Sequence, residues 1–207
     1  MLTFFTVPKP FEGHIALIQR NAIGSWLRLR PACEILLIGQ EKGIAETARE
    51  FGLCHLPDID RNDYGTPLLN SIFERASSAA RNSVLCYVNT DIILMSDFIQ
   101  AAEQVLQHKE PFLMVGQRWD VDLADALDFR PGWEESLRSY VTANGRLHPQ
   151  TGIDYFMFPK GIWGSIPPFA VGRPAWDNWM IYRARANRTA VIDATEMIMA
   201  VHQNHGW

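Results

Sequence analysis

The fold prediction rests mainly on one stretch, Leu85-Cys86-Tyr87-Val88-Asn89-Thr90-Asp91-Ile92-Ile93-Leu94. Its apolar and β-branched residues predict a strand that is buried on both faces. A buried strand offers no low-energy place for an unpaired carboxylate, so Asp91 is expected to emerge at the strand's end or to meet a cation there. Ligands of open α/β sheets bind beyond the carboxyl ends of the strands. Asn89-Thr90-Asp91 is therefore the first candidate for a metal and phosphate site.

Strands and helices alternate on both sides of this stretch. Strands are predicted at residues 3–7, 34–38 and 53–56, and helices at 14–30, 44–51 and 68–80. This βαβαβαβ order predicts an α/β fold with a mostly parallel central sheet and helices on both faces. The second half is predicted to hold helices at 97–108, 133–141 and 175–185, strands at 112–115, 155–158, 191–192 and 197–201, and a Gly- and Pro-rich loop at 159–174. We expect a single domain over residues 1–207, with halves at 1–120 and 121–207.

The composition narrows the classes of function. The chain has 207 residues and a formal net charge of -4 without a basic block, so binding to nucleic acid through bulk electrostatics is not expected. Cys33, Cys54 and Cys86 lack metal-binding spacing and are predicted to be free thiols in a reducing compartment. The first residues do not look like a signal peptide, and apolar runs stay below the ~20 residues of a membrane span. The sequence therefore predicts a cytoplasmic protein.

Two groups of residues could hold a divalent cation. Such a cation takes only one or two carboxylate ligands when a diphosphate fills its other coordination positions. Asp91 could provide such a carboxylate. The alternative is that Asp91 caps a turn while Asn89 bonds the backbone. The predicted strand 197–201 delivers His202 to its carboxyl end, and imidazole suits Mn²⁺-like ions beside a carboxylate. Because residues three apart on an extended chain point to opposite faces, only one of His202 and His205 is expected to be a ligand, and His202 is preferred. The alternative for both is an ordinary hydrogen-bonded or solvated histidine.

A third group lies in Gly172-Arg173-Pro174-Ala175-Trp176-Asp177-Asn178-Trp179. The tryptophans could cover the apolar faces of a sugar, while Asp177 and Asn178 contact its hydroxyl groups. Asp177 could then act as a general base toward an attacking hydroxyl. The alternative is that Asp177 is simply a carboxylate in the first turn of a helix, where the helix dipole favours it.

Smaller candidates follow the ends of other predicted strands. Thr6 and Pro8 end the first strand and are expected to face the same crevice as Asp91. Arg118 could hold phosphate or form a surface ion pair. Asp154 could contact a sugar hydroxyl or cap a turn. Arg173, in the 159–174 loop, could neutralise a leaving diphosphate.

These features, taken in order, resemble a GT-A-fold glycosyltransferase of the nucleotide-diphospho-sugar transferase superfamily. Those that match are the Thr6–Pro8 strand end, Asn89-Thr90-Asp91 in place of an Asp-x-Asp motif, Trp176-Asp177-Asn178, and His202 after the final strands. The matching features span nearly the whole chain. The chain also resembles a group of small bacterial and plant proteins with this fold. A Gly-x-Gly-x-x-Gly fingerprint and a Walker loop are absent from the sequence, which argues against a dehydrogenase or a P-loop enzyme.

The resemblance implies a Rossmann-like GT-A sheet with a small C-terminal acceptor lobe, and a metal-assisted transfer of a sugar from a nucleotide-diphosphate sugar to a carbohydrate or other hydroxyl acceptor. Residues 1–120 would form the nucleotide-binding half, and residues 121–207 the acceptor and metal half. Asp91 and His202 would hold Mn²⁺ or Mg²⁺, and Asp177, the implied catalytic residue, would contact the acceptor or act as the base. The implied donor-binding residues are Thr6, Pro8, Asn89, Thr90, Arg118 and Arg173. The implied acceptor-binding residues are Asp154, Trp176, Asn178 and His205.

One departure from the family pattern is that Asn89 replaces the first Asp of the usual motif, which removes a charge and weakens metal affinity. The chain is also short for the class, so the acceptor lobe is expected to be either minimal or completed by a partner, for which a homo-oligomer is one possibility. Two other functions remain open. A nucleotidyltransferase would need a Gly-rich basic loop after the first strand, where residues 6–13 offer one lysine and one glycine. A non-catalytic carbohydrate- or nucleotide-sugar-binding protein on a degenerate transferase fold is favoured by Asn89.

Overall fold

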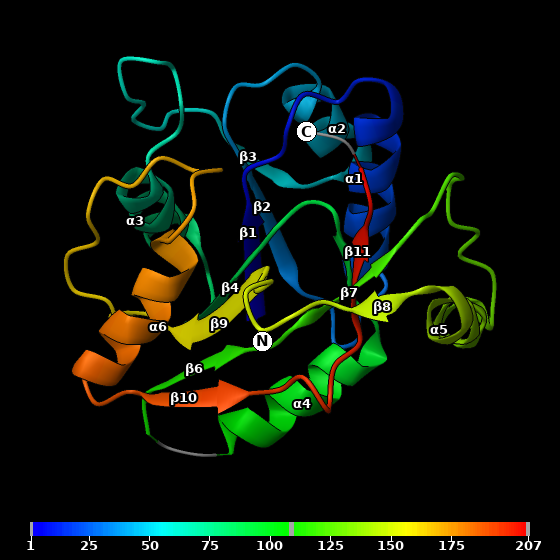
Figure 1. Cartoon of the computed structure of the whole chain (residues 1–207). Coiled ribbons are helices and arrows are strands. Elements are labelled where there is room, and N and C mark those ends of the chain that lie inside the picture. Colours follow the sequence, from blue (N-terminus) through cyan, green and yellow to red (C-terminus); the bar gives the residue numbers. More distant parts are fainter. Residues whose placement is uncertain (1, 108–109, 206–207) are drawn as a thin grey trace.

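A computed structural model describes residues 2–107 and 110–205 of the chain (Figure 1). The strands are β1 (Leu2–Thr6), β2 (Glu34–Ile38), β3 (Cys54–Leu56), β4 (Val84–Val88), β5 (Ile92–Ile93), β6 (Phe112–Val115), β7 (Arg118–Val121), β8 (Arg146–Leu147), β9 (Tyr155–Pro159), β10 (Ala190–Asp193) and β11 (Ala200–Gln203). The helices are α1 (Gly13–Trp26), α2 (Ile44–Phe51), α3 (Leu69–Ala79), α4 (Ser96–Leu106), α5 (Trp133–Asn144) and α6 (Trp176–Ala186).

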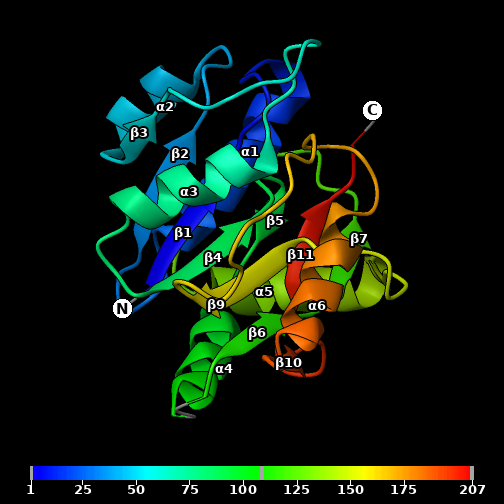
Figure 2. The same cartoon turned by 90° about the vertical axis from the view of Figure 1, so that its left-hand side faces the viewer.

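The central sheet has seven strands in the order β10-β6-β9-β4-β1-β2-β3. The pairs β3–β2, β2–β1, β1–β4 and β6–β10 are parallel, and β9 runs antiparallel to β4 and β6. Helices α3 and α6 cover one face of the sheet, and α1, α2 and α4 cover the other (Figures 1 and 2). The predicted α/β class with a mostly parallel, doubly covered sheet is confirmed.

Both faces of the sheet are apolar because both are covered. In β1, Phe4 packs in the core cluster on the α1 side and Phe5 packs in the cluster on the α3 side, and both are fully buried. Successive side chains of a strand point to opposite faces, so a doubly covered strand needs apolar residues throughout. This is why residues 4–5 of β1, 35–38 of β2 and 84–88 of β4 are apolar without alternation.

The stretch from Leu85 to Leu94 was predicted to be one strand, but it forms two strands in different sheets. β4 ends at Val88 in the central sheet, and β5 joins a second sheet of order β5-β11-β7-β8. Between them, the backbone N–H of Asn89 donates to the carbonyl of Asp154, and that of Ile92 donates to the carbonyl of Asn89. Polar side chains cannot continue between two apolar layers, so the chain turns at residues 89–91 and changes sheets.

Two further boundaries differ from the prediction. Residues 116–120 were expected to be a polar segment after the strand at 112–115, but residues 118–121 form β7, which pairs in parallel with β11. The last strand begins at Ala200, not at Met197, so His202 lies within it and has Asp120 as its register partner. Within residues 2–107 and 110–205, no helix is both long and apolar enough to cross a membrane.

Candidate metal centre and active site

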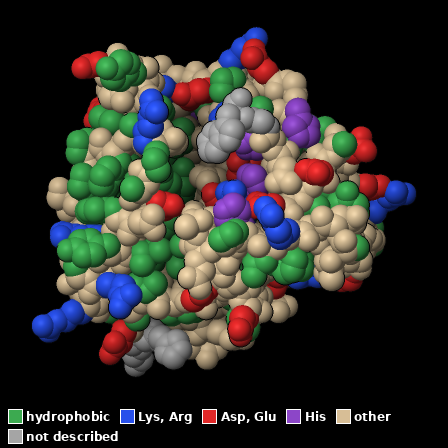
Figure 3. Space-filling view, viewed as in Figure 1, with side chains coloured by type: hydrophobic (Ala, Val, Ile, Leu, Met, Phe, Trp, Pro, Cys, Tyr) green, Lys and Arg blue, Asp and Glu red, His purple; other side chains and the backbone are tan. Residues whose placement is uncertain are grey.

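The turn at residues 89–91 and strand β11 bring one carboxylate and two imidazoles together. Nε2 of His205 lies 3.1 Å from Oδ2 of Asp91, and Nε2 of His202 lies 3.8 Å from the same oxygen. One ligand atom from each of the three residues lies within 4.8 Å of the other two. Histidine and acidic side chains gather near the middle of the face seen in Figure 3. Residues more than a hundred positions apart thus form one polar cluster.

Both histidines face Asp91, although only His202 was expected to. The expectation assumed an extended backbone through residue 205, which would have turned the two rings to opposite sides. Strand β11 ends at Gln203, and the chain then bends, so the rings of His202 and His205 lie 5.6 Å apart between centroids. His205, assigned to an acceptor by the resemblance, belongs geometrically to the cluster around Asp91.

The cluster fits a divalent cation. Ligand atoms about 2.1 Å from an ion and about 90° apart lie about 3 Å from each other, close to the spacing here. Oδ1 of Asp91 is shielded from solvent and has no hydrogen-bond partner among the described residues. A buried carboxylate oxygen without a partner is costly unless a cation or another donor meets it. The donor set, one carboxylate and two imidazoles, suits a transition-metal ion such as Mn²⁺.

The protonation of the cluster is also suitable for binding a metal. Burial raises the pKa of Asp91, but the hydrogen bond with His205 and the charges of His202 and Lys9 outweigh it, so the pKa lies below its ordinary value. Burial, the largest effect on His202, lowers its pKa despite the acidic groups nearby. Near neutral pH this gives a carboxylate beside a neutral imidazole, the forms that bind metals.

A second layer of polar side chains surrounds the cluster. Oδ1 of Asp120 lies 3.2 Å from Nδ1 of His202, although the two atoms are not aligned for a hydrogen bond. Oδ2 of Asp120 lies 2.6 Å from Nδ1 of His148. Nε of Arg118 donates to Asp120 at 2.9 Å. A carboxylate behind a ligating histidine orients its ring and raises its basicity, so Asp120 is placed to support His202.

Arg118, Asp154 and Asn89 bind one another. Nη1 of Arg118 donates to Oδ2 of Asp154 at 2.6 Å, and Nδ2 of Asn89 donates to Oδ1 of Asp154 at 2.5 Å. Asp154 is only 7% exposed. The predicted phosphate contact of Arg118, donor contact of Asn89 and sugar contact of Asp154 stay predictions, while the structure joins the three side chains to one another. The physical reason is that burial raises the pKa of Asp154, and this carboxyl group needs both donors to remain buried.

Thr6 and Thr90 likewise turn inward. Their hydroxyl groups are 2.7 Å apart and form a hydrogen bond, and both side chains are buried. The pair joins the end of β1 to the turn that carries Asp91, and the donor contacts predicted for both residues stay predictions. Pro8 is also buried, at the end of the same chain segment.

The predicted acceptor platform is only partly on the surface. The ring of Trp176 packs in the core, with centroids 5.4 Å from Tyr87 and 5.3 Å from Phe156, so it cannot cover a sugar as expected. Its apolar ring is more stable in the core between those aromatic residues than on the surface. Asp177 is half-buried in the first turn of α6, and its Oδ1 accepts from the backbone N–H of Asn178.

Asn178 and Arg173 are exposed near the start of α6. The backbone at Ala175, just before the helix, has φ +86°, a left-handed conformation that is uncommon for a residue other than glycine. The helix begins at Trp176, one residue later than the predicted start at Ala175.

His148 is a site residue that the sequence analysis missed, and Asp120 was not assigned a role. His148 follows a short strand, and its spacing from Asp91 carries no signal. Only the antiparallel pairing of β8 with β7 brings it to Asp120. Gly152 is packed so closely against His148 that an added Cβ atom would lie 2.2 Å from the ring. Polar residues alternate with apolar ones in the 118–121 segment, a pattern that indicates a strand with one polar face and could have identified Asp120.

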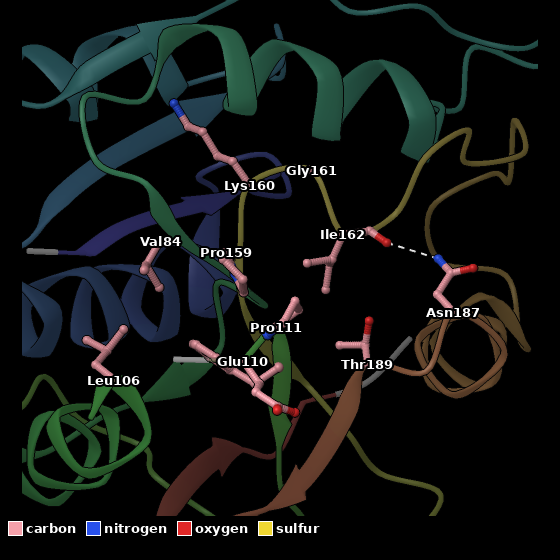
Figure 4. A pocket seen from close by; sticks show the side chains of 11 residues that line it. Val84, Leu106, Glu110, Pro111, Pro159, Lys160, Gly161, Ile162, Asn187 and Thr189 are labelled. Carbon is pink, nitrogen blue, oxygen red and sulfur yellow. Dashed lines mark hydrogen bonds between the residues drawn. The ribbon is translucent and has the colours of Figure 1, made fainter. Parts of the chain in front are cut away.

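Two pockets lie away from this cluster. One of about 540 Å³ lies at the starts of β4, β6 and β10, the opposite edge of the sheet from Asp91 (Figure 4). Asn187 closes one side of it by donating to the carbonyl of Ile162 at 3.0 Å, and the amine of Lys160 is bonded to the carbonyl of Ala80. The other, of about 920 Å³, lies between residues 122–132 and helix α5.

Comparisons with known proteins identify the fold. No sequence family and no curated protein matches this chain. A solved structure assigned to the nucleotide-diphospho-sugar transferases, from Desulfovibrio desulfuricans G20, is 12% identical with a TM-score of 0.53 over 93% of this chain and 78% of that one. Glucosyl-3-phosphoglycerate synthase from Mycobacterium tuberculosis, solved with Mg²⁺ and UDP, is 13% identical with a TM-score of 0.56 over 100% of this chain and 72% of that one. The chain therefore has the GT-A-like fold of the nucleotide-diphospho-sugar transferases.

Proposed function

We propose that this protein is a glycosyltransferase that moves a sugar from a nucleotide-diphosphate sugar to a hydroxyl acceptor, with the help of a divalent cation. The observation that carries the proposal is the convergence of Asp91, His202 and His205 after the β4 strand of a GT-A-like fold. The resemblance placed Asp91 and His202 together from sequence, and the distances of 3.1 and 3.8 Å around Asp91 support a common role.

The three side chains would hold Mn²⁺ or Mg²⁺, and the two imidazoles favour Mn²⁺ because Mg²⁺ prefers oxygen ligands. When bound, the cation supplies positive charge against the diphosphate that leaves the sugar. The fold accommodates Mg²⁺ and UDP in glucosyl-3-phosphoglycerate synthase, which supports this choice of ligands. Asp120, 3.2 Å from His202, is proposed to support that imidazole once the metal is bound, and Arg118 donates a hydrogen bond to Asp120.

Asp177 is proposed as the base that takes the acceptor's proton. The acceptor oxygen forms a bond to the anomeric carbon, the bond from that carbon to the diphosphate oxygen breaks, and the hydroxyl proton passes to the Asp177 carboxylate. The position of α6 supports this role, because Trp176 packs on Tyr87, four residues before Asp91. Asn178 is proposed to contact the acceptor. Arg173 and the chain at Pro8 are proposed to contact the donor.

A second candidate function is a nucleotide-sugar-binding protein without catalysis. It is favoured by Asn89, which replaces a carboxylate and has its amide turned toward Asp154. Such a protein would bind nucleotides but release no free sugar or nucleotide product.

The function is tested by incubating the protein with UDP-, GDP- and CDP-sugars and Mn²⁺ and measuring release of the nucleoside diphosphate, alone and with a panel of glycoside acceptors. We expect turnover with one nucleotide series and loss of turnover with EDTA. Nucleotide binding without turnover would support the second candidate. If none of the donors is either bound or turned over, the proposal is wrong.

Mn²⁺ is expected to stabilise the folded protein. A ligand present at about 100 times its dissociation constant stabilises the native state by about 2.7 kcal/mol when it does not bind the unfolded chain. For a protein of this size, Tm should rise by about 5–10 °C. Thermal melts with Mn²⁺ and with excess EDTA measure the rise in Tm on metal binding and its loss on metal removal. An equal rise in an Asp91→Ala variant would show that Mn²⁺ binds elsewhere.

Replacing Asp177 by asparagine is expected to lower kcat for transfer by about 100-fold, because the base is lost. The asparagine oxygen can still accept the hydrogen bond of the Asn178 N–H, so the start of α6 should survive. Steady-state kinetics with a donor and an acceptor measure the effect, and UDP affinity should stay unchanged. A variant with full kcat would assign Asp177 to the helix start alone.

A further inference from the structure

Gln203 is a polar residue buried in an apolar setting directly beside the metal cluster. Its side chain is fully buried, and it follows His202 in strand β11. Because successive side chains of a strand alternate, His202 faces the cluster and Gln203 faces the other way, toward helix α1. An amide buried at such a position is stable only if its donors and acceptor are satisfied.

The partners of Gln203 converge on the turn that carries Asp91. Nε2 of Gln203 donates to the carbonyl of Asp91 at 3.1 Å and to the carbonyl of Ile18 at 2.8 Å. The backbone N–H of Gln203 donates to the same Asp91 carbonyl at 3.2 Å. Two donors from one residue therefore fix the backbone of Asp91 between β11 and α1.

Asn21 completes the arrangement from α1. Its Nδ2 donates to Oε1 of Gln203 at 2.9 Å and to the carbonyl of Asp125 at 3.2 Å, and its Oδ1 accepts from the N–H of Leu127 at 2.8 Å. Like Gln203, it is buried. A continuous chain of hydrogen bonds thus runs from the Asp91 backbone through Gln203 and Asn21 to the 122–132 segment.

We propose that Gln203 and Asn21 are positioning residues that set the geometry of the metal centre by fixing the Asp91 turn. The inference rests on the proposed metal site. A metal ligand must be held within about 0.5 Å of its productive position by surrounding contacts. A leucine at 203 would fill similar space in this apolar layer, but it would leave the Asp91 carbonyl with one backbone donor and remove the shorter of the two hydrogen bonds that Nδ2 of Asn21 donates. The amide therefore serves the position of Asp91 and not the packing of the layer.

The test compares Gln203→Leu, Asn21→Ala and the double variant for binding of Mn²⁺ alone, followed by the electron paramagnetic resonance signal of free Mn²⁺, together with Tm. Residues behind metal ligands typically change affinity by about 10–100-fold. We expect a loss of about 10-fold or more in each single variant. The double variant should bind no more weakly than Gln203→Leu, because both residues act through one chain of hydrogen bonds.

Thr3→Val is the matched control. Thr3 is also fully buried, and its hydroxyl donates to Glu34 at 2.6 Å, but it lies at the start of β1, the opposite edge of the sheet. It should lower Tm and leave Mn²⁺ affinity unchanged. If Gln203→Leu does not fold, the Asn21→Ala variant, which retains Gln203, tests the inference by itself.

If the variants bind Mn²⁺ within twofold of the wild type while Tm falls as in Thr3→Val, the two residues are purely structural, and the inference is wrong even though the metal site stands. A wild-type protein that binds no Mn²⁺ would overturn the metal centre itself and this inference with it.

Discussion

Replacing Asp91 by alanine is expected to lower the affinity for Mn²⁺ by about 1,000-fold, or about 4 kcal/mol. Asp91 supplies the carboxylate of the cluster, and both imidazoles approach its Oδ2. Without that charge, two neutral imidazoles remain as ligands. Titration of the variant with Mn²⁺, in the absence of nucleotide, measures the loss directly.

The stability of the same variant, measured without metal, should fall as well. In the metal-free protein, Oδ1 of Asp91 is buried without a hydrogen-bond partner in the described part of the chain. Oδ2, however, is bonded to His205, and the neighbouring groups hold the pKa of Asp91 below its ordinary value, so the folded state stabilises this carboxylate and the metal-free Tm of the variant should fall. The exposed Asp58 offers a control, because Asp58→Ala should alter neither Mn²⁺ affinity nor Tm. Unchanged Mn²⁺ affinity in Asp91→Ala would remove Asp91 from the metal centre.

Replacing Arg118 by methionine is expected to destabilise the fold by about 3 kcal/mol, the lower end for breaking a buried ion pair, because the guanidinium is partly solvated. Arg118 contacts Asp154 at 2.6 Å and Asp120 at 2.9 Å, and these carboxylates are only 9% and 13% exposed. Removing the cation leaves both charges buried. A free energy of unfolding from urea titration should show the loss, with Tm lower by about 10 °C.

The control is Arg20→Met on the surface of α1. Arg20 also binds a carboxylate through two nitrogens, at 2.7 Å each, but it and its partner Glu50 are 39% and 54% exposed. Exposed pairs contribute about 0–1 kcal/mol. Adding Asp154→Asn to Arg118→Met should recover part of the stability, because one unpaired charge disappears. Equal losses in the two arginine variants would show that the buried network is no stronger than a surface pair.

The fold was largely predictable because local signals and burial agree in the first half of the chain. Strands such as Glu34–Ile38 and helices such as Ile44–Phe51 begin and end where apolar runs, periodicity and glycines indicate. The break of the Leu85–Leu94 stretch into β4 and β5 was not predicted, since both pieces are equally apolar. Their separation depends on a second sheet whose pairing with β11 is a long-range property.

The candidate site was predictable only in part, for a similar reason. Asp91 and His202 could be paired from strand ends and the family resemblance. The hydrogen bonds that the structure shows within the protein for Thr6, Thr90, Asn89 and Arg118 could not be predicted. The same residue types make exposed contacts with ligands and buried hydrogen bonds. His148 and Gln203 reach the site through strand pairing and alternation alone.

The most direct test of the metal-assisted transferase is a calorimetric titration of the wild-type protein with UDP, GDP and CDP, in Mn²⁺ and in EDTA. We expect one of the three nucleotides to bind, and Mn²⁺ to tighten its binding by at least about 10-fold, or 1.4 kcal/mol. Equal binding with Mn²⁺ and EDTA, or no binding of any of the three, would contradict this expectation.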